Sequence, residues 1–138
     1  MYLIDTNIIS ELRKLKWGRA DPAVAAWAQA MLPALAFYSV ISLMELEMGV
    51  LRMERRNAAQ GRHLRHWLLN DVRPSMGEHL LPVTEAVVLR CAALHVPAPQ
   101  PERDALIAAT ALVHGLTLVT RNIADFSGCG VPLINPSG

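Results

Sequence analysis

The first ten residues, Met1–Ser10, place a short apolar strand directly before an amphipathic helix. Tyr2–Ile4 favours a buried strand, and the apolar residues from Ile8 onward recur at helical spacing. Asp5 stands between the two elements, at the position where open α/β sheets bind ligands. Asp5 can equally be the N-cap of the following helix, so this stretch alone supports both a functional and a structural role.

The same order of strand and helix is repeated along the chain. Strands are expected at residues 2–4, 35–40, 80–83, 116–120 and 131–134, with helices between them. This alternation predicts an α/β fold of three layers, with a mostly parallel sheet and helices on both faces. The last strand is expected at an edge because Pro132 cannot donate a hydrogen bond to a neighbouring strand. A chain of 138 residues without a long linker is expected to form a single domain, residues 1–138.

Two features of the helices give more local expectations. Gly49 lies in the middle of the helix that begins at Ser42, which suggests that another backbone approaches closely there. The arginine-rich region from Arg52 to Arg65 predicts a basic helical hairpin that breaks near Gly61. This region could bind an RNA backbone, or it could be a solvated or partner-binding surface.

Composition limits the classes of function. With 52% hydrophobic and 18% charged residues, disorder is not expected, and a net charge of +1 gives no overall attraction to nucleic acid or membrane. Two cysteines are too few for a disulfide framework, and no signal peptide is evident, so a cytoplasmic location is expected. No charged residue lies between Asp21 and Glu45, but Pro33 interrupts this segment. A helix with Asp21 as its N-cap, followed by a buried strand, explains the segment better than a membrane span.

Four acidic residues stand where a predicted strand ends or a predicted helix begins: Asp5, Glu45, Asp104 and Asp125. In a parallel sheet these positions meet at one edge, so the four carboxylates can converge. Each also has a structural explanation. Glu45 can form a capping box with Ser42, whereas Asp104 can complement a helix N-terminus and Asp125 can belong to a turn.

A cluster of carboxylates repels itself unless a cation lies between its members. Oxygen ligands alone suit Mg²⁺ or Mn²⁺, which usually act on phosphate substrates. Glu11 and Glu47 could join the cluster, although a solvated helix face accounts for them more simply. The chain has no zinc-ligand spacing, no phosphate-binding glycine loop and no nucleophile elbow.

Taken together, four segments in this order resemble the PIN-domain ribonucleases, and closely the VapC-type toxins of bacterial toxin–antitoxin pairs, including the FitB-like branch. The segments are Asp5-Thr6-Asn7, Ser42–Leu46 with Gly49, Arg103–Ala111 and Thr120–Phe126. The resemblance runs essentially from end to end. It implies a PIN-like parallel-sheet fold, a divalent metal and hydrolysis of RNA phosphodiester bonds by an endoribonuclease.

By position, the resemblance implies that Asp5, Glu45, Asp104 and Asp125 are both the catalytic residues and the ligands of Mg²⁺ or Mn²⁺. It places Thr6, Asn7, Thr120 and Asn122 at the supporting polar positions. Water would attack the phosphodiester, so no side chain is needed as a covalent nucleophile.

Partners also follow from the resemblance: an RNA substrate, a small cognate antitoxin that would occupy or wall off the acidic pocket, and a second copy in a homodimer, without a membrane. Large apolar residues of the first two helices could supply the antitoxin surface or simply pack in the core: Ile9, Leu12, Trp17 and Trp27. Two other classes of function stay open: a metal-dependent phosphohydrolase or nuclease acting on DNA or a small phosphate ester, and a non-catalytic module that binds a partner.

Overall fold

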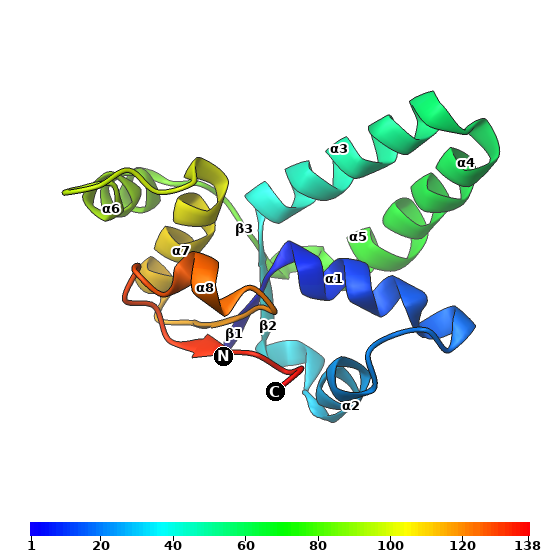
Figure 1. Cartoon of the computed structure of the whole chain (residues 1–138), viewed down its shortest axis with the longest axis horizontal. Coiled ribbons are helices and arrows are strands. Elements are labelled where there is room, and N and C mark those ends of the chain that lie inside the picture. Colours follow the sequence, from blue (N-terminus) through cyan, green and yellow to red (C-terminus); the bar gives the residue numbers. More distant parts are fainter.

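Five parallel strands form one sheet in the computed structural model, which describes residues 1–138 (Figure 1). The strand order is β3-β2-β1-β4-β5. The strands are β1 (Tyr2–Ile4), β2 (Ala36–Ser39), β3 (Leu80–Leu81), β4 (Thr117–Val119) and β5 (Leu133–Ile134). The predicted parallel sheet is therefore confirmed, and β5 lies at an edge as Pro132 indicated.

The middle strand of the sheet is β1, which lies between β2 and β4, and both of its faces are covered. Leu3 and Ile4 point to opposite faces, and each joins a different hydrophobic cluster. Ile4 pairs in register with Val119 of β4. The next residues of the two strands, Asp5 and Thr120, therefore leave the sheet side by side, and the N–H of Asp5 still donates to the carbonyl of Val119 at 2.9 Å.

Helices cover both faces of the sheet and extend beyond it. One core cluster joins β1 to helices α1, α2 and α3, and the other joins it to α7 and α8. Figure 1 shows α3 and α4 as a pair that projects away from the sheet, with α6 and α7 on the other side. The helices are α1 (Thr6–Leu12), α2 (Pro22–Ala30), α3 (Val40–Arg56), α4 (Ala58–Trp67), α5 (Arg73–Met76), α6 (Glu85–Leu94), α7 (Glu102–His114) and α8 (Ile123–Phe126), and a 3₁₀ helix η1 (Arg13–Trp17) follows α1.

The uncharged segment between Asp21 and Glu45 is divided into several elements. It contains α2, β2 and the beginning of α3, with a 3₁₀ turn at Pro33–Leu35. Asp21 accepts hydrogen bonds from the N–H groups of Ala23 and Val24, which confirms the predicted N-cap of α2. None of the helices has the length and apolar character that a membrane span requires.

Two local expectations about the hairpin are wrong. The chain breaks at Asn57, whose side chain accepts from the N–H of Gln60 at 3.1 Å and caps α4, whereas Gly61 lies inside α4. The close approach is also at Gly61 and not at Gly49. A Cβ atom at Gly61 would lie 2.5 Å from the Cα of Glu54, whereas one at Gly49 would meet nothing within 4 Å.

This difference between the two glycines predicts opposite effects of alanine. Gly61→Ala should lower the free energy of unfolding by about 1–3 kcal/mol, because backbone of α3 would have to move away from the new methyl group. Gly49→Ala is the matched control and should be neutral or stabilising by up to about 1 kcal/mol, because alanine favours a helix interior. Urea denaturation of both variants measures the effect, and equal stabilities would contradict the close packing of α3 on α4.

Candidate metal and active site

The carboxylate of Asp5 has both of the roles that the sequence allowed. One oxygen, Oδ1, accepts from the N–H of Thr6 at 2.8 Å and caps α1. The other, Oδ2, accepts from the hydroxyl of Thr120 at 2.8 Å. Only 6% of Asp5 is exposed, so the group is held at the end of β1 by donors from two different elements.

Glu45 does not form the capping box with Ser42 that the sequence suggested. The helix α3 begins two residues earlier, at Val40, and its N-cap is Ser39, whose hydroxyl accepts from the N–H of Ile41 at 3.0 Å. Glu45 therefore lies more than one turn inside α3. Its side chain is consequently free to face α1, where the hydroxyl of Thr6 donates to Oε1 at 2.6 Å.

Asp104 lies in the first turn of α7, and its carboxylate is close enough to Asp125 and Glu45 for their charges to act on it. Asp5, Glu45 and Asp104 line one cavity of about 410 Å³, which contains no hydrophobic lining residue. Asp125 is exposed on α8 and does not line this cavity. The structure thus brings three of the four predicted acids into one cavity. The fourth, Asp125, affects this cavity through the effect of its negative charge on Asp104.

Burial and nearby negative charge raise the pKa values of two of these carboxylates, Asp5 and Asp104. The pKa of Asp5 is raised from 3.8 to about 6, and burial is the largest cause. The hydrogen bonds from Thr120 and Thr6 lower this pKa, whereas the negative charges of Asp104 and Glu45 make smaller contributions that raise it. Burial also raises the pKa of Asp104, as do the charges of Asp125 and Glu45. The site therefore favours either protons or a cation.

The donor set fits a hydrated divalent ion better than a fully protein-coordinated one. No three acidic, histidine or cysteine side chains form a group that could hold a metal ion as they stand. Mg²⁺, however, is usually bound by one or two carboxylates and keeps several waters. Asp5 and Asp104, which line the same polar cavity, could supply those carboxylates, and Glu45 could contact the waters.

Three of the predicted supporting residues hold the acids in place. Thr6 contacts Glu45, as described, and Thr120 is fully buried and donates to Asp5. The hydroxyl oxygen of Thr120 accepts from the side chain of Asn7 at 3.2 Å and from the N–H of Asn122 at 3.0 Å. The Asn122 side chain lines the cavity without forming a protein hydrogen bond, so it is available to water or a ligand.

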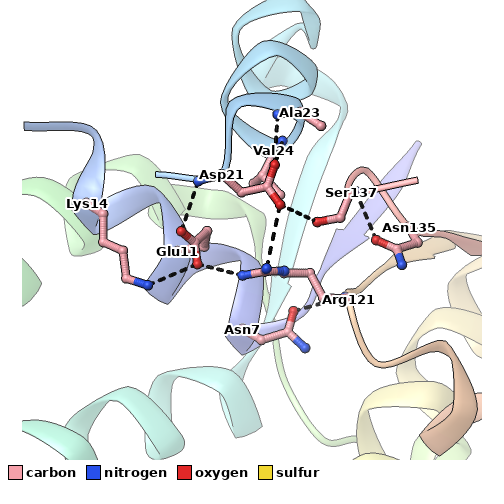
Figure 2. A network of polar contacts seen from close by, with 9 residues as sticks. All are labelled: Asn7, Glu11, Lys14, Asp21, Ala23, Val24, Arg121, Asn135 and Ser137. Atoms are coloured by element: carbon pink, nitrogen blue, oxygen red, sulfur yellow. Dashed lines mark hydrogen bonds and ion pairs between the residues drawn. The ribbon is translucent and has the colours of Figure 1, made fainter. Parts of the chain in front are cut away.

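Glu11 is the functional-site residue whose environment the sequence analysis placed wrongly. It is neither on a solvated face nor in the acid cluster: it is 6% exposed and pairs with Arg121 at 2.5 Å and with Lys14 at 3.2 Å. Figure 2 shows Arg121 reaching toward both Glu11 and Asp21. The i, i+4 spacing of Asn7 and Glu11 is the sequence signal that places both on one helix face.

This network fixes the loop that carries Thr120. The N–H of Arg121 donates to Asn7 Oδ1 at 3.3 Å, and Glu11 also accepts from the N–H of Asp21 at 3.1 Å. Asp21 in turn accepts from the hydroxyl of Ser137, which ties the C-terminal segment to the same cluster (Figure 2). Three segments distant in sequence therefore meet beside the acid cavity.

The arginine-rich region is partly neutralised. Arg65 forms a bidentate ion pair with Glu47, at 2.5 and 2.8 Å, and a further pair with Glu54 at 3.1 Å. Glu47 therefore joins α3 to α4 and does not belong to the acid cluster. The other arginines of this region are exposed and form no ion pair: Arg52, Arg55, Arg56 and Arg62.

A family model for the PIN domain matches residues 2–127, and the chain belongs to this family. It is similar to VapC ribonuclease Y4jK of Sinorhizobium fredii, with 33% identity over 99% of this chain and 97% of the relative. It is also similar to the toxin FitB of Neisseria gonorrhoeae, with 31% identity over 99% of this chain and 98% of FitB. The resemblance to VapC-type proteins and to the FitB-like branch is thus confirmed.

Solved structures agree with this assignment. A crystal structure of FitAcB from Neisseria gonorrhoeae matches with a TM-score of 0.89 and 30% identity, covering 99% of this chain and 98% of that one. A toxin–antitoxin complex from Klebsiella pneumoniae matches with a TM-score of 0.67 and 27% identity, covering 99% of this chain and 98% of that one. These matches confirm the predicted PIN-like α/β fold.

The raised pKa of Asp5 predicts how stability depends on pH. The carboxyl group of Asp5 holds its proton more tightly in the folded protein than in the unfolded chain. The free energy of unfolding therefore falls as pH rises from about 4 to about 6. In chelator at about pH 8, Asp5→Asn should therefore be more stable than wild type by about 1 kcal/mol, because asparagine still caps the helix but carries no charge.

Chemical denaturation at about pH 5 and about pH 8 measures this difference. Glu78→Gln is the control, because Glu78 is an exposed acid outside the cavity that forms no ion pair. Should Asp5→Asn be less stable than wild type at both pH values, with the same pH dependence, Asp5 would be a helix cap and nothing more.

Proposed function

We propose that this chain is a metal-dependent endoribonuclease and the toxin of a toxin–antitoxin pair. The observation that carries the proposal is the single polar cavity lined by Asp5, Glu45 and Asp104, in a chain of the PIN domain family. The raised pKa values of Asp5 and Asp104 favour the binding of a cation there. The predicted single domain, cytoplasmic location and homodimer belong to the same proposal.

Asp5 and Asp104 would be the principal ligands of Mg²⁺ or Mn²⁺, with Glu45 and Asp125 acting directly or through water. A divalent ion supplies activation of water and neutralisation of phosphate charge. No cysteine or serine needs to attack the phosphodiester. The acids therefore act as ligands, and the rest of the cavity orients the substrate.

The supporting side chains have separate tasks in this proposal. Thr120 donates to Asp5 and so favours its ionised form, which is the form that can bind a cation. Thr6 holds Glu45 toward the cavity through a 2.6 Å hydrogen bond. Asn122 is positioned to orient water or a phosphate oxygen, and Arg103, whose side chain is 47% exposed and 3.6 Å from Glu45, can contact the RNA backbone.

The antitoxin is proposed to cover the acidic cavity. An arginine side chain would match its paired carboxylates in a bidentate geometry and compete with the metal. A segment that folds on binding could do this while it covers apolar surface of the toxin. Of the apolar residues suggested for that surface, Trp17 is exposed, whereas Ile9 is buried and Leu12 and Trp27 pack against the core, so only Trp17 is available without rearrangement.

Parallel incubation of the purified protein with RNA, DNA and a chromogenic phosphate ester tests the proposal. Wild type should cleave RNA when Mg²⁺ or Mn²⁺ is added and not in chelator. Asp5→Asn and Asp104→Asn should each lower the rate by about a hundredfold or more, since each removes a metal ligand. Glu85→Gln is the control, because this exposed acid of α6 lies outside the cavity and should retain wild-type activity.

The same assay separates the alternatives. Cleavage of DNA or of the ester, but not of RNA, would assign a different phosphohydrolase activity. Absence of all three activities with every metal would leave a partner-binding module. The protein encoded by an adjacent small reading frame should inhibit RNA cleavage, and it should still bind Asp5→Asn because most of the contact would lie outside the cavity.

A further inference from the structure

A second cavity, of about 630 Å³, lies between η1 and the α3–α4 hairpin. Basic residues, two histidines and two tryptophans are among the residues that line this cavity, and no acidic residue lines it. The lining residues are Arg13, Lys16, Trp17, Met53, Gln60, His63, Leu64, His66 and Trp67. The proposed function has assigned no role to this cavity.

Arg13 and two tryptophans form the centre of this surface. The guanidinium of Arg13 lies 5.5 Å from the ring centroid of Trp17 and 6.0 Å from that of Trp67, within the range of cation–π attraction. Arg13 forms no ion pair with a carboxylate, unlike Lys16, which pairs with Asp71 at 2.9 Å. Trp17 is 57% exposed, which leaves a large aromatic surface in contact with water.

The second cavity and the acid cavity share one lining residue, Arg13. Arg13 lines both cavities, and Lys14 lines the acid cavity beside it. The helix α1 links them, because Thr6 at its beginning contacts Glu45 and η1 begins directly after its end. Seven helical residues span about 10 Å, so a short run of nucleotides is enough to reach from one cavity to the other.

We infer that Arg13, Trp17 and Trp67 form a subsite for single-stranded RNA next to the cleavage site. Arg13 contacts a phosphate of the substrate, and an unpaired base stacks on the indole of Trp17. This inference rests on the proposed ribonuclease function and adds where the substrate is held. It also implies that the enzyme prefers unpaired RNA, because a base inside a duplex cannot stack on a protein side chain.

Charge and chemistry favour this occupant over a protein segment. A groove with positive charge and exposed aromatic rings is typical of single-strand binding, since stacking tolerates any base and the cations follow the backbone. The cavity offers no acid to pair with the basic side chain proposed for the antitoxin. Residues of α3 and α4 form one wall of the cavity, and the exposed arginines of the earlier arginine-rich region lie on the same hairpin, although none of them lines the cavity.

The test measures binding and cleavage separately. Binding of a fluorescein-labelled single-stranded RNA about ten nucleotides long is followed by anisotropy in chelator, where no cleavage occurs. Trp17→Ala and Arg13→Gln should each weaken binding about tenfold, and Trp17→Phe should retain most of it because phenylalanine still stacks. Leu89→Ala and Arg90→Gln are matched controls, since both residues are exposed on α6, away from both cavities.

Cleavage kinetics with Mg²⁺ complete the test. For Trp17→Ala, KM for the long RNA should rise about tenfold with kcat nearly unchanged, whereas a dinucleotide too short to reach Trp17 should be cleaved as by wild type.

Should both variants bind and cleave RNA like wild type while wild type is active, the subsite is wrong and the ribonuclease proposal stands. Should they lose affinity only for the antitoxin, the cavity is a protein-docking surface. A wild type that binds the RNA through Trp17 but cleaves nothing would overturn the ribonuclease proposal and leave the binding surface.

Discussion

The buried carboxylate of Asp5 is the group on which the rest of the site depends. It directly follows the central strand, caps the first helix and accepts a hydrogen bond from the hydroxyl of Thr120, in the loop after β4. Burial of a charged group is unfavourable, and the two nearby acids add repulsion. The hydrogen bonds offset only part of this cost, because the pKa remains raised to about 6. A group with this combination is typical of a functional site rather than of a structural one.

The hydrogen bond from Thr120 to Asp5 requires that the loop after β4 is held in place. Ion pairs of Arg121, outside the acid cluster, hold this loop. Arg121 lies between Glu11 and Asp21, and its N–H contacts Asn7. These contacts hold Arg121 in place and thereby keep the preceding residue, Thr120, next to Asp5. Because Glu11 is neutralised by Arg121 and Lys14, it lines the cavity without adding an uncompensated negative charge to the cluster. The uncompensated negative charge of the cavity thus comes from Asp5, Glu45 and Asp104, with the charge of Asp125 acting on Asp104.

Features set by local pattern could be predicted from the sequence. Apolar runs indicated the strands, Asp21 indicated a helix cap, and Asp5 was correctly placed at the end of β1, beside the polar cavity. What failed depended on contacts between distant residues. Gly49 and Gly61 look alike in sequence, but only Gly61 faces a neighbouring backbone. Ser42 and Glu45 have the capping-box spacing, yet Ser39 starts the helix because β2 ends there. The pairing of Glu47 with Arg65 depends on how α3 packs on α4.

Burial and the charges of nearby acids disfavour the ionised forms of Asp5 and Asp104, and we propose that a bound divalent cation relieves this effect. The most direct test is the pKa of Asp5 itself, measured from its side-chain ¹³C carboxyl signal by NMR, with Asp5→Asn used to assign the signal. We expect a pKa of about 6 in chelator and a clear decrease when Mg²⁺ is added, because a bound metal favours the ionised form. A pKa near 4 that does not change with Mg²⁺ would contradict it.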